Sequence, residues 1–64
     1  MKRRDLVRHL EEHGCIIQRE GSSHTLYGRP GSVHKEAVPR HTEIKKHLAR
    51  SICRNLNVPV PKGA

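Results

Sequence analysis

The sequence predicts a small α+β domain of order α-β-β-β-α, with a three-stranded antiparallel sheet and both helices on one face of it. Two observations favour this class. Apolar residues recur at helical spacing near both ends of the 64-residue chain, and three short β-branched runs lie between them, separated by turns that contain Gly or Pro. Two amphipathic helices and one small sheet share a core only if both helices cover the same face, so we expect the other face to stay open.

The first helix is expected over residues 3–13. Leu6, Val7 and Leu10 form one apolar stripe, and Gly14 follows as the residue that ends the helix. No Ser, Thr or Asp stands where the capping residue belongs. The helix should therefore depend on packing against the rest of the domain.

The three strands are expected at residues 15–19, 24–27 and 33–38. The turn between the first two begins at Gly21, which can adopt the positive φ that many tight turns require. The Gly-Arg-Pro-Gly-Ser sequence after the second strand is a loop signal. Pro39 ends the third strand because it lacks the N–H that a ladder needs. Short turns join all three strands, so an antiparallel meander is the simplest arrangement.

The last helix is expected to begin at Thr42, a favourable capping residue, with Glu43 in its first turn. Its apolar face consists of residues that recur every four positions: Ile44, Leu48, Ile52 and Leu56. The prolines within residues 59–64 predict an extended or disordered tail. The complete order is that of double-stranded-RNA-binding domains.

The core of this domain has to be thin. The chain contains one Tyr and neither Phe nor Trp, and a domain of this size buries only about 60% of its unfolded surface. We therefore expect an oligomer or a partner protein to add stability. Cys15 and Cys53 lie beside apolar residues, without a secretory signal or a membrane-spanning run. We interpret the chain as a cytoplasmic protein with reduced thiols and no membrane association.

The charge of the chain indicates a nucleic-acid partner. Its formal net charge is +7, with 13 Lys and Arg residues against 6 Asp and Glu residues. Residues 21–64 hold eight of the basic and two of the acidic residues, so most of the excess lies there. Small basic domains bind nucleic acid because each phosphate contact releases counterions. Ribosomal proteins and partners of acidic proteins carry the same signal, so charge alone does not choose among them.

One histidine, His24, is a candidate for proton transfer in a reaction on RNA. His24 follows a Gly-Ser-Ser turn and opens the second strand, so its imidazole should be held beside small hydroxyls. An imidazole exchanges a proton near neutral pH, and RNA carries its own nucleophile, the 2′-hydroxyl. Turns of this kind are also common without catalysis. Strict alternation puts His24 on the side of Leu26, so either the strand begins after His24 or Leu26 faces away from the core.

Two motifs resemble one family of bacterial proteins. Gly21-Ser22-Ser23-His24 resembles the Gly-Ser-x-His segment of HicA-like (YcfA-like) mRNA interferase toxins, and Val38-Pro39-Arg40-His41 is similar to their hydrophobic-Pro-x-His segment. Residues 43–45 and 52–56 resemble parts of their final helix. The resemblance covers about residues 3–58, and we interpret residues 1–58 as a single HicA-like domain.

The resemblance implies the toxin of a type II toxin–antitoxin system. Such a toxin is an endoribonuclease that cleaves single-stranded mRNA with one histidine, needs no metal or other cofactor, and is inhibited by a HicB-type antitoxin. The catalytic position carried over by the motif is His24. A higher-order toxin–antitoxin complex is compatible with this assignment. Cys15 and Leu26 stand where many members carry an aromatic residue, which puts core packing and base stacking in question.

The residues expected to bind RNA lie close to this histidine in the sequence or on the last helix: Ser22, Ser23, Arg40, His41, Lys45 and Lys46. Ser22 and Ser23 are also ordinary turn formers, and His41 suits a helix cap as well as an RNA contact. The second acid–base group that cleavage requires is not identified. The alternative function is a small basic RNA-binding domain without catalysis, which would share the fold and the charge.

His9 and His13 are four residues apart on the first helix, a spacing at which one metal can bridge two side chains. Leu10 replaces the Glu of a zinc-protease helix, and the sequence has no C-x-x-C pair. We therefore expect a solvated pair and no metal site. Tyr27 is expected to pack across strands, with stacking on a base as the alternative.

Overall fold

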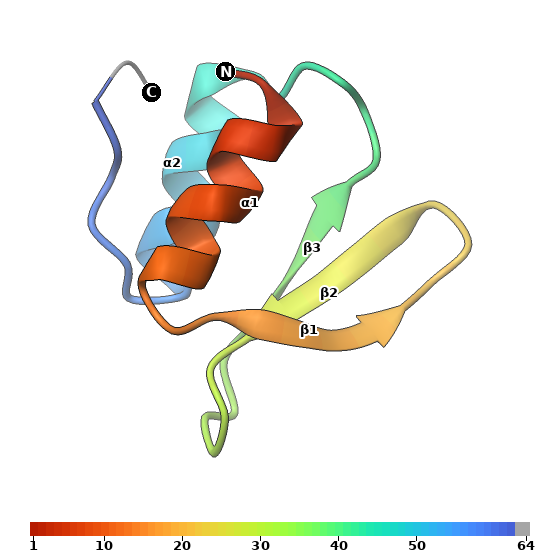
Figure 1. Cartoon of the computed structure of the whole chain (residues 1–64), viewed down its shortest axis with the longest axis vertical. Helices are drawn as coiled ribbons and strands as arrows, with labels where there is room; N and C mark the ends of the chain where they lie inside the picture. Colours follow the sequence, from red (N-terminus) through yellow and green to blue (C-terminus); the bar gives the residue numbers. More distant parts are fainter. Residues whose placement is uncertain (63–64) are drawn as a thin grey trace.

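The computed structural model describes residues 1–62. Its elements are α1 (Arg3–Glu12), β1 (Ile16–Glu20), β2 (His24–Gly28), β3 (Lys35–Pro39) and α2 (Lys46–Asn55). β2 lies in the middle of one sheet, and both neighbours run antiparallel to it. Figure 1 shows α1 and α2 side by side on the same face of this sheet. The predicted α-β-β-β-α class is confirmed, with a fold like that of double-stranded-RNA-binding domains.

Side chains of β2 alternate between the two faces of the sheet. Thr25 and Tyr27 are buried, whereas His24 is exposed and Leu26 is half-buried. His24 is paired with Pro39 of β3, and Leu26 with Ala37. Leu26 therefore faces away from the core, which decides between the two alternatives for this strand. β1 carries an irregularity between Ile17 and Arg19, and all its side chains are exposed.

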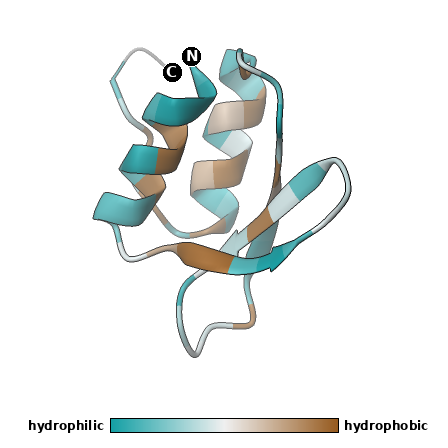
Figure 2. Cartoon of the chain, turned by 45° about the vertical axis from the view of Figure 1, so that its right-hand side comes forward, coloured by the Kyte–Doolittle hydropathy of each residue, from teal (hydrophilic) through white to brown (hydrophobic). Residues whose placement is uncertain are grey.

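The core lies between the helices and the covered face of the sheet. It consists of Leu6, Leu10, Cys15, Tyr27, Val38, Ile44, Ala49, Ile52, Cys53, Leu56 and Val58. Figure 2 shows the hydrophobic residues of the helices gathered on their inner sides. Tyr27 is buried in this core, which leaves its ring unavailable for stacking on a base, and burial raises the pKa of its hydroxyl. Cys15 and Cys53 are free and buried, and desolvation raises the pKa of the Cys53 thiol, so both act as small hydrophobic groups.

Each helix is followed, two residues after its last one, by a residue with positive φ. Gly14 has φ of 87°, and the Cys15 N–H donates to the Leu10 carbonyl at 2.9 Å, which completes the expected end of α1. Asn57 has φ of 58° after α2, and the Val58 N–H donates to the Cys53 carbonyl at 2.8 Å. No side-chain cap bond is present at the start of either helix, so packing is what stabilises them.

The expected start of the last helix is wrong. α2 begins at Lys46, and the Thr42 carbonyl instead accepts a 2.8 Å bond from the Arg3 N–H. The Ile44 N–H donates to the Met1 carbonyl at 2.7 Å, and Lys2 and Glu43 form an isolated antiparallel bridge. These bonds to the N-terminal segment satisfy the backbone polar groups of Thr42 and Ile44. A helical turn at this place would break the same bonds. The first four residues of the predicted helix are thereby held extended beside α1.

The boundaries of the third strand also differ from the prediction. β3 begins at Lys35, and Val33, predicted as its first residue, is 88% exposed in the preceding loop. Pro39 remains within the strand as its last residue and is buried. A proline is tolerated there because β3 is an edge strand whose outer side needs no ladder donor.

His9 and His13 are half-buried and bonded to carbonyls, which corrects the expectation of a solvated pair. His9 Nε2 lies 2.6 Å from the Pro59 carbonyl, and His13 Nδ1 lies 2.9 Å from the His9 carbonyl. Residues 59–62 contain no helix or strand, and residues 63–64 lie outside the described part, so the predicted tail stays a prediction. Within residues 1–62 the two helices have ten residues each, too short and too polar to cross a bilayer.

Candidate active site

In the turn between β1 and β2, Gly21 lies close to the His24 carbonyl and does not adopt a positive φ. The Gly21 N–H donates to the His24 carbonyl at 2.9 Å, which closes the turn. The glycines with positive φ in residues 1–62 are Gly14 and Gly31, so the turn does not use the left-handed conformation that Gly21 could adopt. A Cβ at Gly21 would lie 3.1 Å from the His24 carbonyl oxygen, which is tighter than most real contacts. Lack of a side chain is what this position requires.

His24 is presented at the end of β2 with one ring nitrogen engaged. Its Nδ1 lies 3.0 Å from the Ser23 hydroxyl, within hydrogen-bond distance. The tautomer decides which of the two donates. The side chain is exposed, and because Nδ1 faces the Ser23 hydroxyl, Nε2 is the nitrogen left to meet a ligand. A serine that orients an imidazole in this way is a suitable neighbour for proton transfer.

A pocket of about 330 Å³ opens beside this histidine. Its walls come from β2, β3, the segment that leads into α2, and α2 itself: His24, Pro39, His41, Glu43, Ile44, Lys45 and Leu48. Pro39, Ile44 and Leu48 supply apolar surface, while two imidazoles, a carboxylate and an ammonium supply polar groups. His41 reaches the pocket because Pro39, two residues before it, is the cross-strand partner of His24.

Arg40 holds the turn from the other side. Its guanidinium donates to the Ser22 carbonyl at 2.9 Å, to the His24 carbonyl at 3.3 Å and to Glu20 Oε1 at 2.7 Å. The bond from Arg40 is the main reason that the pKa of the Glu20 carboxyl is lowered, and a second bond, from Thr25, adds to it. One side chain thus ties the end of β1 to the turn that carries His24.

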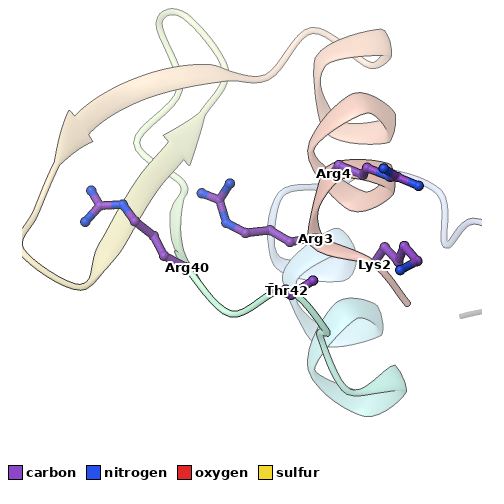
Figure 3. A pocket seen from close by; sticks show the side chains of 5 residues that line it. All are labelled: Lys2, Arg3, Arg4, Arg40 and Thr42. Carbon is purple, nitrogen blue, oxygen red and sulfur yellow. The ribbon is translucent and has the colours of Figure 1, made fainter.

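A buried hydroxyl continues this network into the domain. Thr25 is 2% exposed and donates to Glu20 Oε1 at 2.8 Å. It accepts a 3.2 Å bond from Arg3 Nη2, and Arg3 Nε donates to the Pro39 carbonyl at 3.0 Å. In Figure 3 Arg3 extends from the start of α1 towards the same region as Arg40. The sheet edge beside His24 is therefore cross-linked to α1 by polar contacts.

Most of the residues expected to bind RNA gather around His24. His41 and Lys45 share its pocket, Ser23 bonds its ring, and Arg40 bonds its carbonyl and that of Ser22. Lys46 is exposed at the first position of α2 and is not among the residues that line the pocket.

Three residues of the network had no signal in the sequence. Glu20, Thr25 and Arg3 belong to different elements, and no spacing rule relates them. A hydrophobic pattern could at best have marked Thr25, whose neighbours on the same side of β2 face the core. Within residues 1–62, no three His, Cys, Asp or Glu side chains converge in a way that would hold a metal ion.

Comparison with known proteins gives one match. A family model described as the HicA toxin of bacterial toxin–antitoxin systems matches residues 3–58, which is most of the chain. No curated protein and no solved structure matches at a significant level. The matched residues include both motifs, the whole sheet and both helices.

Proposed function

Because the chain belongs to the HicA toxin family of bacterial toxin–antitoxin systems, we propose that this toxin is a metal-independent endoribonuclease that cleaves mRNA with His24. The observation that carries the proposal is the His24 pocket. An exposed imidazole, oriented by Ser23, faces a hollow that also contains a second imidazole and a lysine. These are the groups that cleavage of RNA through its own 2′-hydroxyl requires.

The proposed reaction is a transesterification within the RNA. His24 Nε2 accepts the proton of the 2′-hydroxyl, and the 2′-oxygen attacks the adjacent phosphorus. The bond from phosphorus to the 5′-oxygen of the next nucleotide breaks, and that oxygen takes up a proton. The products are a 2′,3′-cyclic phosphate and a new 5′-hydroxyl end. Atoms and charges balance without any further reactant, because the base takes one proton from the 2′-hydroxyl and the acid gives one proton to the 5′-oxygen.

His41 is the proposed source of the second proton. It lines the same pocket as His24 and lies two residues beyond Pro39, the cross-strand partner of His24. A protonated imidazole can give its proton to the leaving 5′-oxygen while the neutral one acts as base. Lys45, at the rim of the pocket, is placed in this scheme against the negative charge that develops on the phosphate.

The apolar wall of the pocket supports a single-stranded substrate. Pro39, Ile44 and Leu48 offer a surface on which one nucleotide can rest, and the pocket volume of about 330 Å³ suits a group of that size. A base paired in a duplex cannot turn into such a hollow without breaking its stack. We therefore expect cleavage in single-stranded mRNA.

The family also implies a partner, the antitoxin of the system. We propose a HicB-type antitoxin that binds over the His24 pocket and so prevents RNA from entering. The basic character of this toxin favours an acidic covering segment, which would speed association by long-range attraction. A stable cover should bury about 800 Å² of the toxin. Hydrogen exchange of residues 21–26 should then be slower in the complex than in the free toxin.

One assay tests the proposed activity. Purified toxin is incubated with single-stranded RNA in EDTA, and the products are examined for 2′,3′-cyclic phosphate ends. His24→Ala should abolish cleavage while leaving the circular dichroism spectrum and RNA binding near wild type, because His24 is exposed and contributes to no core contact. Equal cleavage by the alanine variant would remove His24 from the mechanism. RNA binding without any cleavage by the wild type would favour a non-catalytic RNA-binding domain instead.

A further inference from the structure

Side chains of the segment after β3 alternate between two pockets. Pro39, His41 and Glu43 line the His24 pocket, whereas Arg40 and Thr42 line a second one. This is the alternation of an extended chain, with successive side chains on opposite sides. The two pockets therefore share one wall only a single strand thick.

The second pocket, which we call the basic pocket, is lined by Lys2, Arg3, Arg4, Arg40 and Thr42 and has a volume of about 270 Å³ (Figure 3). Four of these five residues are cationic, and no acidic residue is among them. Figure 3 shows Arg3 and Arg40 extending to one side of the start of α1, and Lys2 and Arg4 to the other. The cationic side chains thus lie on both sides of the start of α1 and extend beyond the pocket. An anionic chain fits this distribution better than an isolated ion does.

Arg3 is oriented before any ligand arrives. Its Nε donates to the Pro39 carbonyl at 3.0 Å, and its Nη2 donates to the Thr25 hydroxyl at 3.2 Å. A guanidinium fixed by two such bonds loses little side-chain entropy when it binds a phosphate oxygen. Arg40 is fixed in the same way by Glu20 and by the turn. The pocket is smaller than those that enclose whole small-molecule ligands, which suits one phosphate group of a longer chain.

We propose that the basic pocket binds a backbone phosphate of the RNA, on the nucleotide next to the scissile bond. The inference deepens the proposed ribonuclease function and rests on it for the choice of RNA as the ligand. Arg40 connects the two pockets, because it lines the basic pocket and also donates to the His24 carbonyl. A strand that crosses the shared wall places one nucleotide at His24 and the neighbouring phosphate in the basic pocket.

The test compares two charge-matched double variants. Lys2→Gln/Arg4→Gln removes two exposed cations of the basic pocket, and the bridge at Lys2 is retained because it is formed by backbone. Arg8→Gln/Arg54→Gln removes the same charge from residues that line other pockets. Affinity is measured as a function of salt with a single-stranded oligonucleotide whose 2′-O-methyl groups prevent cleavage. Circular dichroism verifies that both variants are folded.

The basic-pocket variant should bind this RNA more weakly, with a salt slope smaller by about 0.7 for the one phosphate contact, which amounts to roughly 5-fold at 0.1 M salt. The control variant, Arg8→Gln/Arg54→Gln, should show a much smaller loss of RNA affinity. A methylphosphonate at the linkage next to the cleavage site should weaken binding by the wild type more than binding by the basic-pocket variant, in which only Arg3 and Arg40 remain to hold that phosphate. Equal losses in the two variants, no RNA binding by the wild type, or a loss confined to antitoxin binding would each overturn the proposal.

A separate cleavage assay keeps the two proposals apart. If the wild type fails to cleave unmodified RNA while the difference between the variants persists, the ribonuclease function is lost and the phosphate site stands. If the wild type cleaves and both variants bind alike, the function stands and the phosphate site is wrong. Arg3→Lys provides a further variant: it keeps the charge but loses the planar fork, and it should weaken binding without the full change in salt slope.

Discussion

Arg40 Nη2 lies 2.7 Å from Glu20 Oε1, and this ion pair spans the turn that carries His24. Glu20 ends β1, and Arg40 follows the last residue of β3, so the contact closes the sheet across its central strand. The same guanidinium holds two carbonyls of the turn. The position of the proposed catalytic imidazole therefore depends on a carboxylate that is itself exposed to solvent.

The Glu20 carboxyl should make stability and activity depend on pH in the acidic range. Its pKa is lowered, chiefly by the bond from Arg40. A carboxyl with a lowered pKa in the folded state contributes stability above its unfolded pKa, and the contribution is lost as pH falls through the folded pKa. The effect should be small because the group is exposed. Thermal unfolding from pH 7 to pH 3 measures it.

Glu20→Gln should lower the melting temperature slightly at pH 7 and by less as the pH falls, so the two curves should converge on acidification. Glu12→Gln, at an exposed position of α1 that makes no ion pair within residues 1–62, is the control. A constant difference between wild type and Glu20→Gln at every pH would contradict this prediction.

Thr25→Val should destabilise the domain although it preserves shape. The buried hydroxyl donates to Glu20 and accepts from Arg3. Its removal leaves each of these two groups with one hydrogen bond fewer. We expect a loss of about 1–3 kcal/mol in the free energy of unfolding, measured by urea denaturation. Thr42→Val is a matched control because Thr42 is exposed and uses its carbonyl rather than its hydroxyl. Equal losses in the two variants would show that the hydroxyl bonds of Thr25 do not matter.

His41→Gln should slow cleavage by about 10²–10⁴-fold if His41 supplies the second proton. The wild-type rate should show a bell-shaped dependence on pH, because one imidazole must be neutral and the other protonated. The variant should lose one limb of this bell. His34→Gln is the control, since His34 is exposed at the other end of β3 and lines a different pocket. A slower variant that keeps the full bell would mean that His41 only positions RNA.

Lys45→Gln should weaken RNA binding and cleavage more than Lys46→Gln does. Lys45 lines the His24 pocket, whereas Lys46 is the first residue of α2 and lies outside it. Each lost phosphate contact should reduce the slope of log K against log salt by about 0.7 for a single strand. Titrations at several salt concentrations give this slope. Equal slopes for both variants and the wild type would mean that RNA follows another path.

Local patterns determined which segments become helices and strands. The stripe of Leu6 and Leu10 with Gly14 behind it specified α1 and its end, because apolar periodicity and a left-handed C-terminal residue act within a few positions. The turn before His24 likewise depends on residues close to one another in the sequence. The motif identified the histidine from its immediate neighbours, and the bonds from Ser23 and Gly21 to His24 are themselves between near neighbours.

Tertiary contacts decided the features for which local patterns allow two outcomes. Alternation relates His24 to Leu26 but does not say which face of β2 the helices cover; burial of Thr25 and Tyr27 chose that face. Thr42 has the chemistry of a helix cap, yet pairing of its segment with the N-terminus moved the start of α2 to Lys46.

The polar network beside His24 also arises only on folding. Its bonds join Arg3 to Thr25 and Arg40 to Glu20, over 22 and 20 positions of sequence. Backbone preferences act over a few residues, so they specify the elements and not the contacts between them. Arg3 reaches the sheet because α1 and β2 bury their apolar faces in one core, and that burial brings a helix, two strand ends and a turn to the same histidine.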